Sequence, residues 1–118
     1  MCFSRIKFFQ KFSFTDLDSK DINSKSVVVK LNIKSCFNKI KQNLLTLNVK
    51  KFIPNEEYNE LFYVVDEDSE VTILLLEKEN GGTIISSHVK SDQINKSYKV
   101  LSNVMFNIRE LFNNYLEV

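Results

Sequence analysis

The stretch that most limits how this chain can fold is residues 61–89, which contain both glycines of the 118-residue sequence. Runs of apolar and β-branched residues are interrupted there by two turn-forming tetrapeptides, residues 66–69 and 79–82. The second contains Asn80-Gly81, which is typical of a type I′ hairpin turn because both central residues of that turn need positive φ. Residues 61–89 are therefore predicted to form a three-stranded antiparallel meander.

The middle strand of this meander, residues 71–77, is apolar on both faces. Leu74, Leu75 and Leu76 are consecutive, and neighbouring side chains of a strand point to opposite faces of the sheet. Central strands have this composition when each face is covered. We therefore expect cover on both faces, with a partner supplying what the helices of the chain do not.

Two amphipathic helices are expected, one on each side of the meander in the sequence. Residues 35–48 carry apolar residues at spacings of three and four after Ser35, a suitable N-cap, and Pro54 prevents the helix from continuing. Residues 92–116, capped by Ser91 or Asp92, carry a longer stripe that is typical either of a helix lying across a sheet or of a coiled coil. This stripe consists of Ile94, Tyr98, Leu101, Met105, Ile108, Phe112 and Tyr115.

The N-terminal part of the chain is predicted to add two strands. Residues 26–33 alternate between apolar and polar positions, as a half-buried strand does. Residues 1–15 contain five Phe, three basic residues and no acid. They are compatible with a strand, with an interaction surface, or with an amphipathic targeting segment. For residues 55–60 a single helical turn and a loop both remain open.

These elements predict a single α+β domain over residues 1–118, with a mostly antiparallel sheet of about five strands, two packed helices and the order β-β-α-β-β-β-α. A hydrophobic content of 43% and a charged content of 26% are typical of globular proteins. No apolar run is long enough to span a membrane. Cys2 and Cys36 are expected to be reduced thiols, and the protein is expected to be cytoplasmic.

Residues with catalytic or metal-binding chemistry do not form a convincing set. His88 is the sole histidine; a pair with Cys2 or Cys36 would lack an orienting partner, so a strand histidine with a hydrogen bond is the simpler interpretation. Asp66, Asp68 and the following acids resemble the start of a calcium loop, but the position that needs Gly is Val71. We therefore predict no enzymatic activity, no cofactor and no metal.

Charge is divided unevenly along the chain. Residues 1–54 contain 11 basic and 3 acidic residues, a net charge of +8, whereas residues 55–118 contain 5 basic and 12 acidic residues, a net charge of −7. This division marks an interaction surface, unless the two halves fold together and neutralise each other. The basic half supplies candidate phosphate contacts at Lys39, Lys41, Lys50 and Lys51.

Two resemblances concern the order of elements. A helix, three strands and a second helix resemble double-stranded-RNA-binding domains, but their RNA-contacting loop would correspond here to residues 66–70, whose acids repel phosphate. With two strands before the first helix, the order resembles longin-like and roadblock-like modules, which implies a dimerising adaptor.

We therefore expect a non-enzymatic interaction domain, an adaptor or a subunit of a larger assembly, with a protein partner or a second copy of itself. An RNA- or ribosome-associated protein is the alternative. The candidate protein interface consists of Phe8, Phe9, Phe12, Phe14, Tyr98, Met105, Phe112 and Tyr115.

Overall fold

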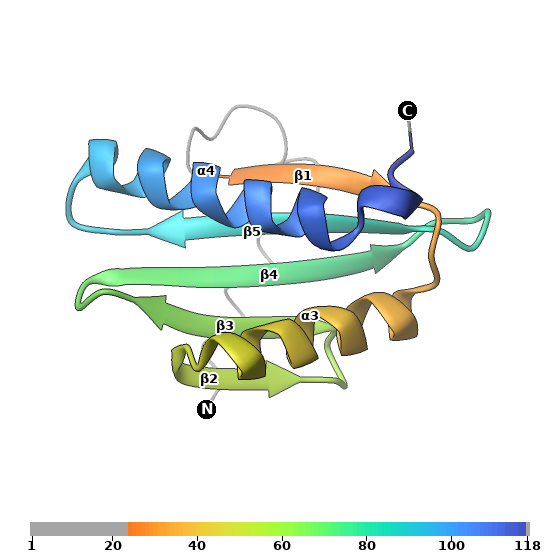
Figure 1. Ribbon diagram of the computed structural model, residues 1–118, viewed down its shortest axis with the longest axis horizontal. Coiled ribbons are helices and arrows are strands. Elements are labelled where there is room, and N and C mark those ends of the chain that lie inside the picture. The colour runs from red at the N-terminus through yellow and green to blue at the C-terminus, as the bar shows by residue number, and fades with distance from the viewer. Residues whose placement is uncertain (1–23, 118) are drawn as a thin grey trace.

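Figure 1 shows the computed structural model of the protein, which describes residues 24–117. In this part of the chain, five strands and two α-helices follow in the order β1-α3-β2-β3-β4-β5-α4, and a short 3-10 helix, η1, comes last. The elements are β1 (Ser24–Val29), α3 (Ile33–Leu47), β2 (Lys50–Asn55), β3 (Glu60–Val65), β4 (Ser69–Glu77), β5 (Thr83–Lys90), α4 (Ile94–Leu111) and η1 (Asn113–Tyr115).

The strands form one sheet in the order β1-β5-β4-β3-β2, and every neighbouring pair is antiparallel. The predicted α+β class is confirmed, and so is the meander, which corresponds to β3, β4 and β5. The predicted order of elements is wrong after the first helix, because four strands follow that helix and not three. The resemblances to longin-like modules and to double-stranded-RNA-binding domains therefore lose their basis.

Strand β2 is the element that the sequence reasoning does not predict. It occupies an edge of the sheet and includes Pro54, which is tolerated there because an edge strand leaves one side of its backbone without a ladder partner. An irregularity between Lys50 and Ile53, with Lys51 at a φ of 51°, shifts its pairing with β3. The strand proposed for the Phe-rich residues 1–15 lies outside the described residues.

The helix boundaries differ from the predicted ones, and neither predicted N-cap is used. Helix α3 is capped by Asn32, whose side-chain oxygen accepts a hydrogen bond from the backbone N–H of Ser35 at 2.9 Å. Ser35, the predicted cap, thus lies inside the helix. Helix α4 begins after Gln93, with no side-chain cap, and ends before Phe112, where the backbone leaves the helical conformation. The expected continuation to residue 116 is wrong.

The second hairpin closes differently from the predicted type I′ turn. Among its turn residues Gly81 has a φ of 89°, whereas Asn80 is not in the positive-φ region. The N–H of Gly81 donates to the carbonyl of Lys78 at 3.0 Å, and the N–H of Lys78 donates to the carbonyl of Gly82 at 2.8 Å. This is the pattern of a three-residue loop in which Gly follows a turn in the left-handed position.

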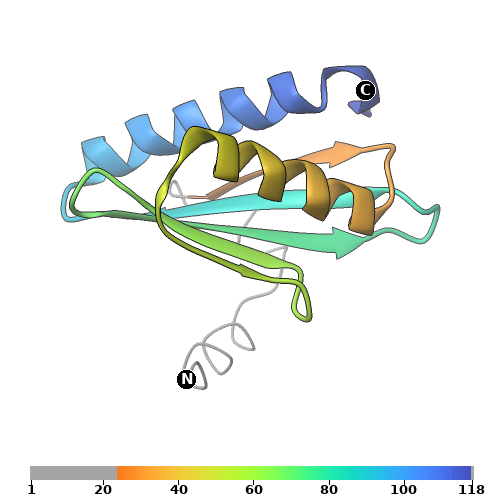
Figure 2. The ribbon, with the colours of Figure 1, turned by 60° about the horizontal axis from the view of Figure 1, so that its bottom comes forward.

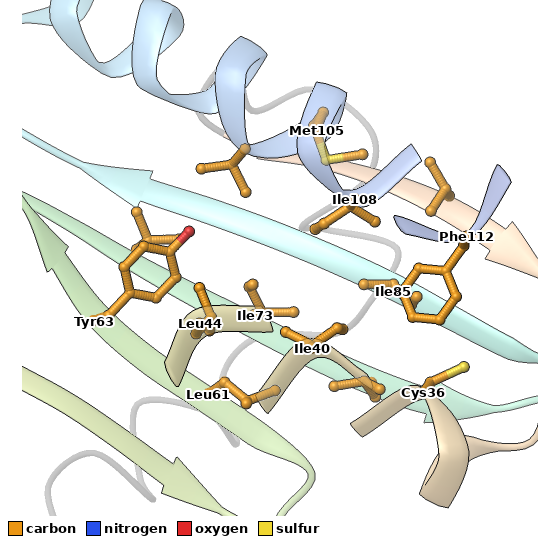
Figure 3. Packing of buried hydrophobic residues seen from close by; sticks show 14 of the residues in the cluster. Cys36, Ile40, Leu44, Leu61, Tyr63, Ile73, Ile85, Met105, Ile108 and Phe112 are labelled. Atoms are coloured by element: carbon orange, nitrogen blue, oxygen red, sulfur yellow. The ribbon is translucent and has the colours of Figure 1, made fainter. Parts of the chain in front are cut away.

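Both helices pack on the same face of the sheet (Figure 2). Between the helices and the sheet, buried side chains from α3, α4 and the strands form a continuous core (Figure 3). Its fully buried large side chains include Phe37, Leu61, Ile73, Ile85 and Phe112. Of the cover expected on both faces of the middle strand, the described helices therefore supply one face.

Candidate functional site

Helix α4 exposes an apolar stripe although its inner side belongs to the core. Ile94, Tyr98 and Phe106 are 61%, 56% and 63% exposed, the highest values among the large hydrophobic residues of the described chain. Their spacings of four and eight residues turn them to one side of the helix. Exposed apolar side chains that gather on one element are typical of interaction sites.

Helix α4 runs next to the edge strand β1 (Figure 1). Side chains of these two elements line a groove beside the stripe. It is an open hollow of about 380 Å³. We call it the α4 groove, and its lining residues are Lys25, Tyr98, Leu101, Ser102, Met105, Phe106 and Arg109.

The side chains of the α4 groove divide into an apolar base and a basic border. Leu101 and Met105 are buried, so they offer apolar surface at the bottom, while Tyr98 and Phe106 project into solvent. Lys25 from β1 and Arg109 from α4 supply positive charge, and none of the described lining residues is acidic. Aromatic residues, Met and Arg are the types that protein interfaces favour.

Four of the predicted interface residues lie in the described chain, and the structure separates these four into two groups. Tyr98 and Met105 both line the α4 groove. Phe112 is 0% exposed and belongs to the core, and Tyr115 is half-buried in η1. Phe8, Phe9, Phe12 and Phe14 lie outside the described residues. Phe106 lines the groove but was not predicted from the sequence. The signal for it was a large aromatic residue that lies off the apolar stripe of an amphipathic helix and is therefore expected to be exposed.

The four candidate phosphate contacts do not form one surface on α3. Lys39 and Lys41 are about 200° apart around the helix because they are two residues apart. Lys50 and Lys51 are exposed at the start of β2. These lysines therefore occupy two elements and different sides of α3.

The basic and acidic halves of the sequence are interleaved in the fold. The basic half supplies α3 and the two edge strands β1 and β2, whereas the acidic half supplies the three inner strands and α4. Within the acidic half, Nζ of Lys96 lies 2.6 Å from Oδ1 of Asp68, and Nζ of Lys78 lies 3.1 Å from Oε1 of Glu117. Because Lys96 is paired with the acidic turn, the start of α4 offers one fewer cation to phosphate.

The face of the sheet opposite the helices also carries apolar side chains. On neighbouring strands, Ile84 of β5 is the register partner of both Val28 of β1 and Leu76 of β4. Phe62 of β3 is likewise the partner of Ile53 of β2. Leu76 and Ile53 are exposed, whereas the others of this set are half-buried. Serines and a threonine separate the apolar positions, so this surface is more mixed than the α4 groove.

Two of the residues considered for catalysis, Cys36 and His88, are separated by the sheet, and Cys2 lies outside the described residues. Cys36 is fully buried on the helix side, where burial raises the pKa of its thiol. His88 faces the other side, and its Nδ1 lies 2.7 Å from the hydroxyl oxygen of Ser24. A Cys36–His88 pair is therefore excluded, and the predicted strand histidine with a hydrogen bond is confirmed.

Two further features concern metals and membranes. Within residues 24–117, no group of three or more His, Cys, Asp or Glu side chains is placed to hold a metal ion. Neither described helix has the length and apolar character needed to cross a bilayer.

A comparison with protein-family models and with the sequences of curated proteins found no match.

Proposed function

We propose that this protein is a non-enzymatic interaction domain that binds a segment of a partner protein in the α4 groove. The observation that carries the proposal is the exposure of Ile94, Tyr98 and Phe106 on one side of α4. Water contact with large apolar side chains is unfavourable, and a partner that covers them would gain the corresponding burial free energy.

The chemistry of the groove favours an acidic, apolar peptide as the partner segment. Leu101 and Met105 form an apolar base that suits one or two large apolar side chains. The Met side chain is flexible, so it can adjust to side chains of different shape. Lys25 and Arg109 would attract carboxylates beside those apolar side chains and would speed association at low salt.

Selection from a displayed library of random peptides tests this proposal directly. The immobilised protein should enrich peptides that combine large apolar residues with Asp or Glu. A synthetic peptide with the enriched sequence should bind the purified protein in calorimetry. Tyr98→Ala and Phe106→Ala should each weaken that binding about tenfold or more, as expected for aromatic residues at the centre of an interface.

Tyr58→Ala is the matched control, because Tyr58 is also an exposed tyrosine (48%) but lies in the turn between β2 and β3. This variant should bind the peptide as the unchanged protein does. Failure to enrich any peptide would contradict the proposal, and so would peptide binding that Tyr98→Ala and Phe106→Ala leave unchanged. A concentration-dependent dimer that Phe106→Ala abolishes would instead assign the groove to a second copy of the chain.

RNA binding through the basic half is the alternative function. The pairing of Lys96 with Asp68 and the spread of Lys39, Lys41 and Lys50 over two elements speak against a continuous phosphate-binding surface. A fluorescent RNA oligonucleotide tests the alternative at low salt. Binding that weakens steeply with added salt, and that Lys50→Glu reduces, would favour RNA over a peptide partner.

A further inference from the structure

A second cavity lies on the opposite side of α4 from the α4 groove, between α3 and α4. It has a volume of about 190 Å³. Its floor is formed by β3 and β4, with Tyr63 and Ile73, and its walls by Leu44 of α3 and by Val104 and Ile108 of α4. We call it the interhelical pocket.

The interhelical pocket is apolar and uncharged. Its lining, all within the described chain, contains no Lys, Arg, His, Asp or Glu. Asn43, Asn103 and Asn107 are its only polar residues besides Tyr63, and one comes from α3 and two from α4. A site of this kind offers no positive charge to pair with a phosphate or a carboxylate, and burying an unpaired charge is strongly unfavourable.

Tyr63 gives the pocket its one specific feature. The residue is 6% exposed, and Figure 3 shows its ring beside Leu44 with the hydroxyl turned away from β3. Among residues 24–117, none forms a hydrogen bond with this hydroxyl. Burial raises the pKa of Tyr63, so the hydroxyl stays protonated and is available as a donor. Because Tyr63 lines the pocket, a molecule bound there can offer the acceptor that the described residues do not.

The volume limits the size of a ligand. Apolar cavities of about 150 Å³ can hold a benzene molecule, whereas drug-sized ligands occupy pockets of about 300–1,000 Å³. A pocket of about 190 Å³ therefore suits a molecule with a single ring or a short branched chain.

From the cavity, its uncharged lining and the position of Tyr63, we infer that the interhelical pocket binds a small, uncharged, mostly apolar molecule that carries one hydrogen-bond acceptor. The acceptor takes the proton of the Tyr63 hydroxyl in a hydrogen bond, and the apolar body contacts Leu44, Val104 and Ile108. This site is independent of the α4 groove and of any partner bound there.

Acetophenone and ethylbenzene form a probe pair that tests the inference. Both have one aromatic ring and a similar shape, but acetophenone alone has a carbonyl acceptor. In nuclear magnetic resonance titrations of the ¹⁵N-labelled protein, acetophenone should shift backbone signals around Leu44, Val104 and Leu111, and should bind more tightly than ethylbenzene. Tyr63→Phe should weaken acetophenone binding about three- to tenfold, as expected for one hydrogen bond, and should change ethylbenzene binding by less than about twofold.

Two variants that reduce the space provide the control. Val104→Phe should fill the pocket and abolish binding of both probes. Asn107→Trp places a large side chain at an exposed lining position and should block entry even if Val104→Phe fails to fold. The inference is overturned if acetophenone produces no localised shifts, if Tyr63→Phe affects both probes equally, or if Asn107→Trp binds acetophenone as well as the unchanged protein does. Equal binding of the two probes would show that the acceptor contributes nothing and would also overturn it.

Discussion

The ammonium group of Lys96 lies 2.6 Å from Oδ1 of Asp68, so the first turn of α4 is tied to the acidic turn between β3 and β4. The hydrogen bond from Lys96 is the main cause that lowers the pKa of Asp68, and the same bond raises the pKa of Lys96. Through this contact the three-residue acidic turn stabilises the position of the helix that forms the α4 groove.

Replacing Asp68 by Asn should lower the stability of the protein in a pH-dependent way. A lowered carboxyl pKa stabilises the fold above the unfolded value of about 3.9, and this contribution is lost as the pH falls through the folded value. The raised pKa of Lys96 contributes below its unfolded value of about 10.4 and is lost as the pH rises through the folded value. Melting temperatures of the two proteins should therefore differ at pH 7 and converge in acid.

Added salt provides the control for this prediction, because the pair is partly exposed to solvent and salt screens such pairs. The difference between the unchanged protein and Asp68→Asn should shrink at high ionic strength. Glu67→Gln, in the same turn, should change the melting temperature less. A difference that is the same at all pH values would contradict the assignment to this ion pair.

The cap of α3 predicts different effects on stability for the replacement of Asn32 and of Ser35. Asn32 accepts a hydrogen bond from the N–H of Ser35, so Asn32→Ala should lower the free energy of unfolding by about 1 kcal/mol. Ser35→Ala should change it little, because Ser35 is inside the helix, where Ala has the higher helix propensity. Urea denaturation measures both, and a larger loss for Ser35→Ala would contradict the observed cap.

Local patterns in the sequence were sufficient for the meander and for the existence of both helices, because alternation and helical periodicity report burial directly. Strand β2 could not be predicted in this way. Its residues are mostly exposed, so they show no burial pattern, and Pro54 indicates a break. The strand forms through its pairing with β3 and not through a buried face of its own. The α4 groove was only half predicted, because Phe106 lies off the heptad-like stripe and its neighbour Lys25 comes from the distant strand β1. The interhelical pocket depends on how far apart α3 and α4 lie, which periodicity does not report.

Gly82 is required by a close approach between the β4–β5 connection and the end of β1. A Cβ atom at this position would lie 2.7 Å from the carbonyl oxygen of Val29, which is backbone and cannot rotate away. Gly82→Ala should therefore lower the free energy of unfolding by about 1–3 kcal/mol, as other overpacking substitutions do. Glu79→Ala, an exposed change in the same turn, should be nearly neutral in the same urea titration. Equal stability of the two variants would contradict the close approach.

The hydroxyl of Tyr63 should not stabilise the protein without a ligand. Because no described residue forms a hydrogen bond with it, Tyr63→Phe removes the hydroxyl of a largely buried residue and no bond within the described chain. We expect the free energy of unfolding to stay the same or to rise by about 1 kcal/mol. A loss of more than about 1 kcal/mol in urea denaturation would reveal an internal partner of the hydroxyl.

Phe106 and Phe112 are six positions apart, yet their replacement should affect different properties. Phe112 is 0% exposed and Phe106 is 63% exposed. Phe112→Ala should lower the free energy of unfolding by about 3–5 kcal/mol, because it leaves a cavity in the core. Phe106→Ala should change the free energy of unfolding by less than about 0.5 kcal/mol, as surface substitutions usually do, while it weakens binding of the selected peptide. Urea denaturation and peptide calorimetry on the same two variants separate the roles. If Phe106→Ala destabilises the fold as much as Phe112→Ala does, then Phe106 belongs to the core and not to a binding surface.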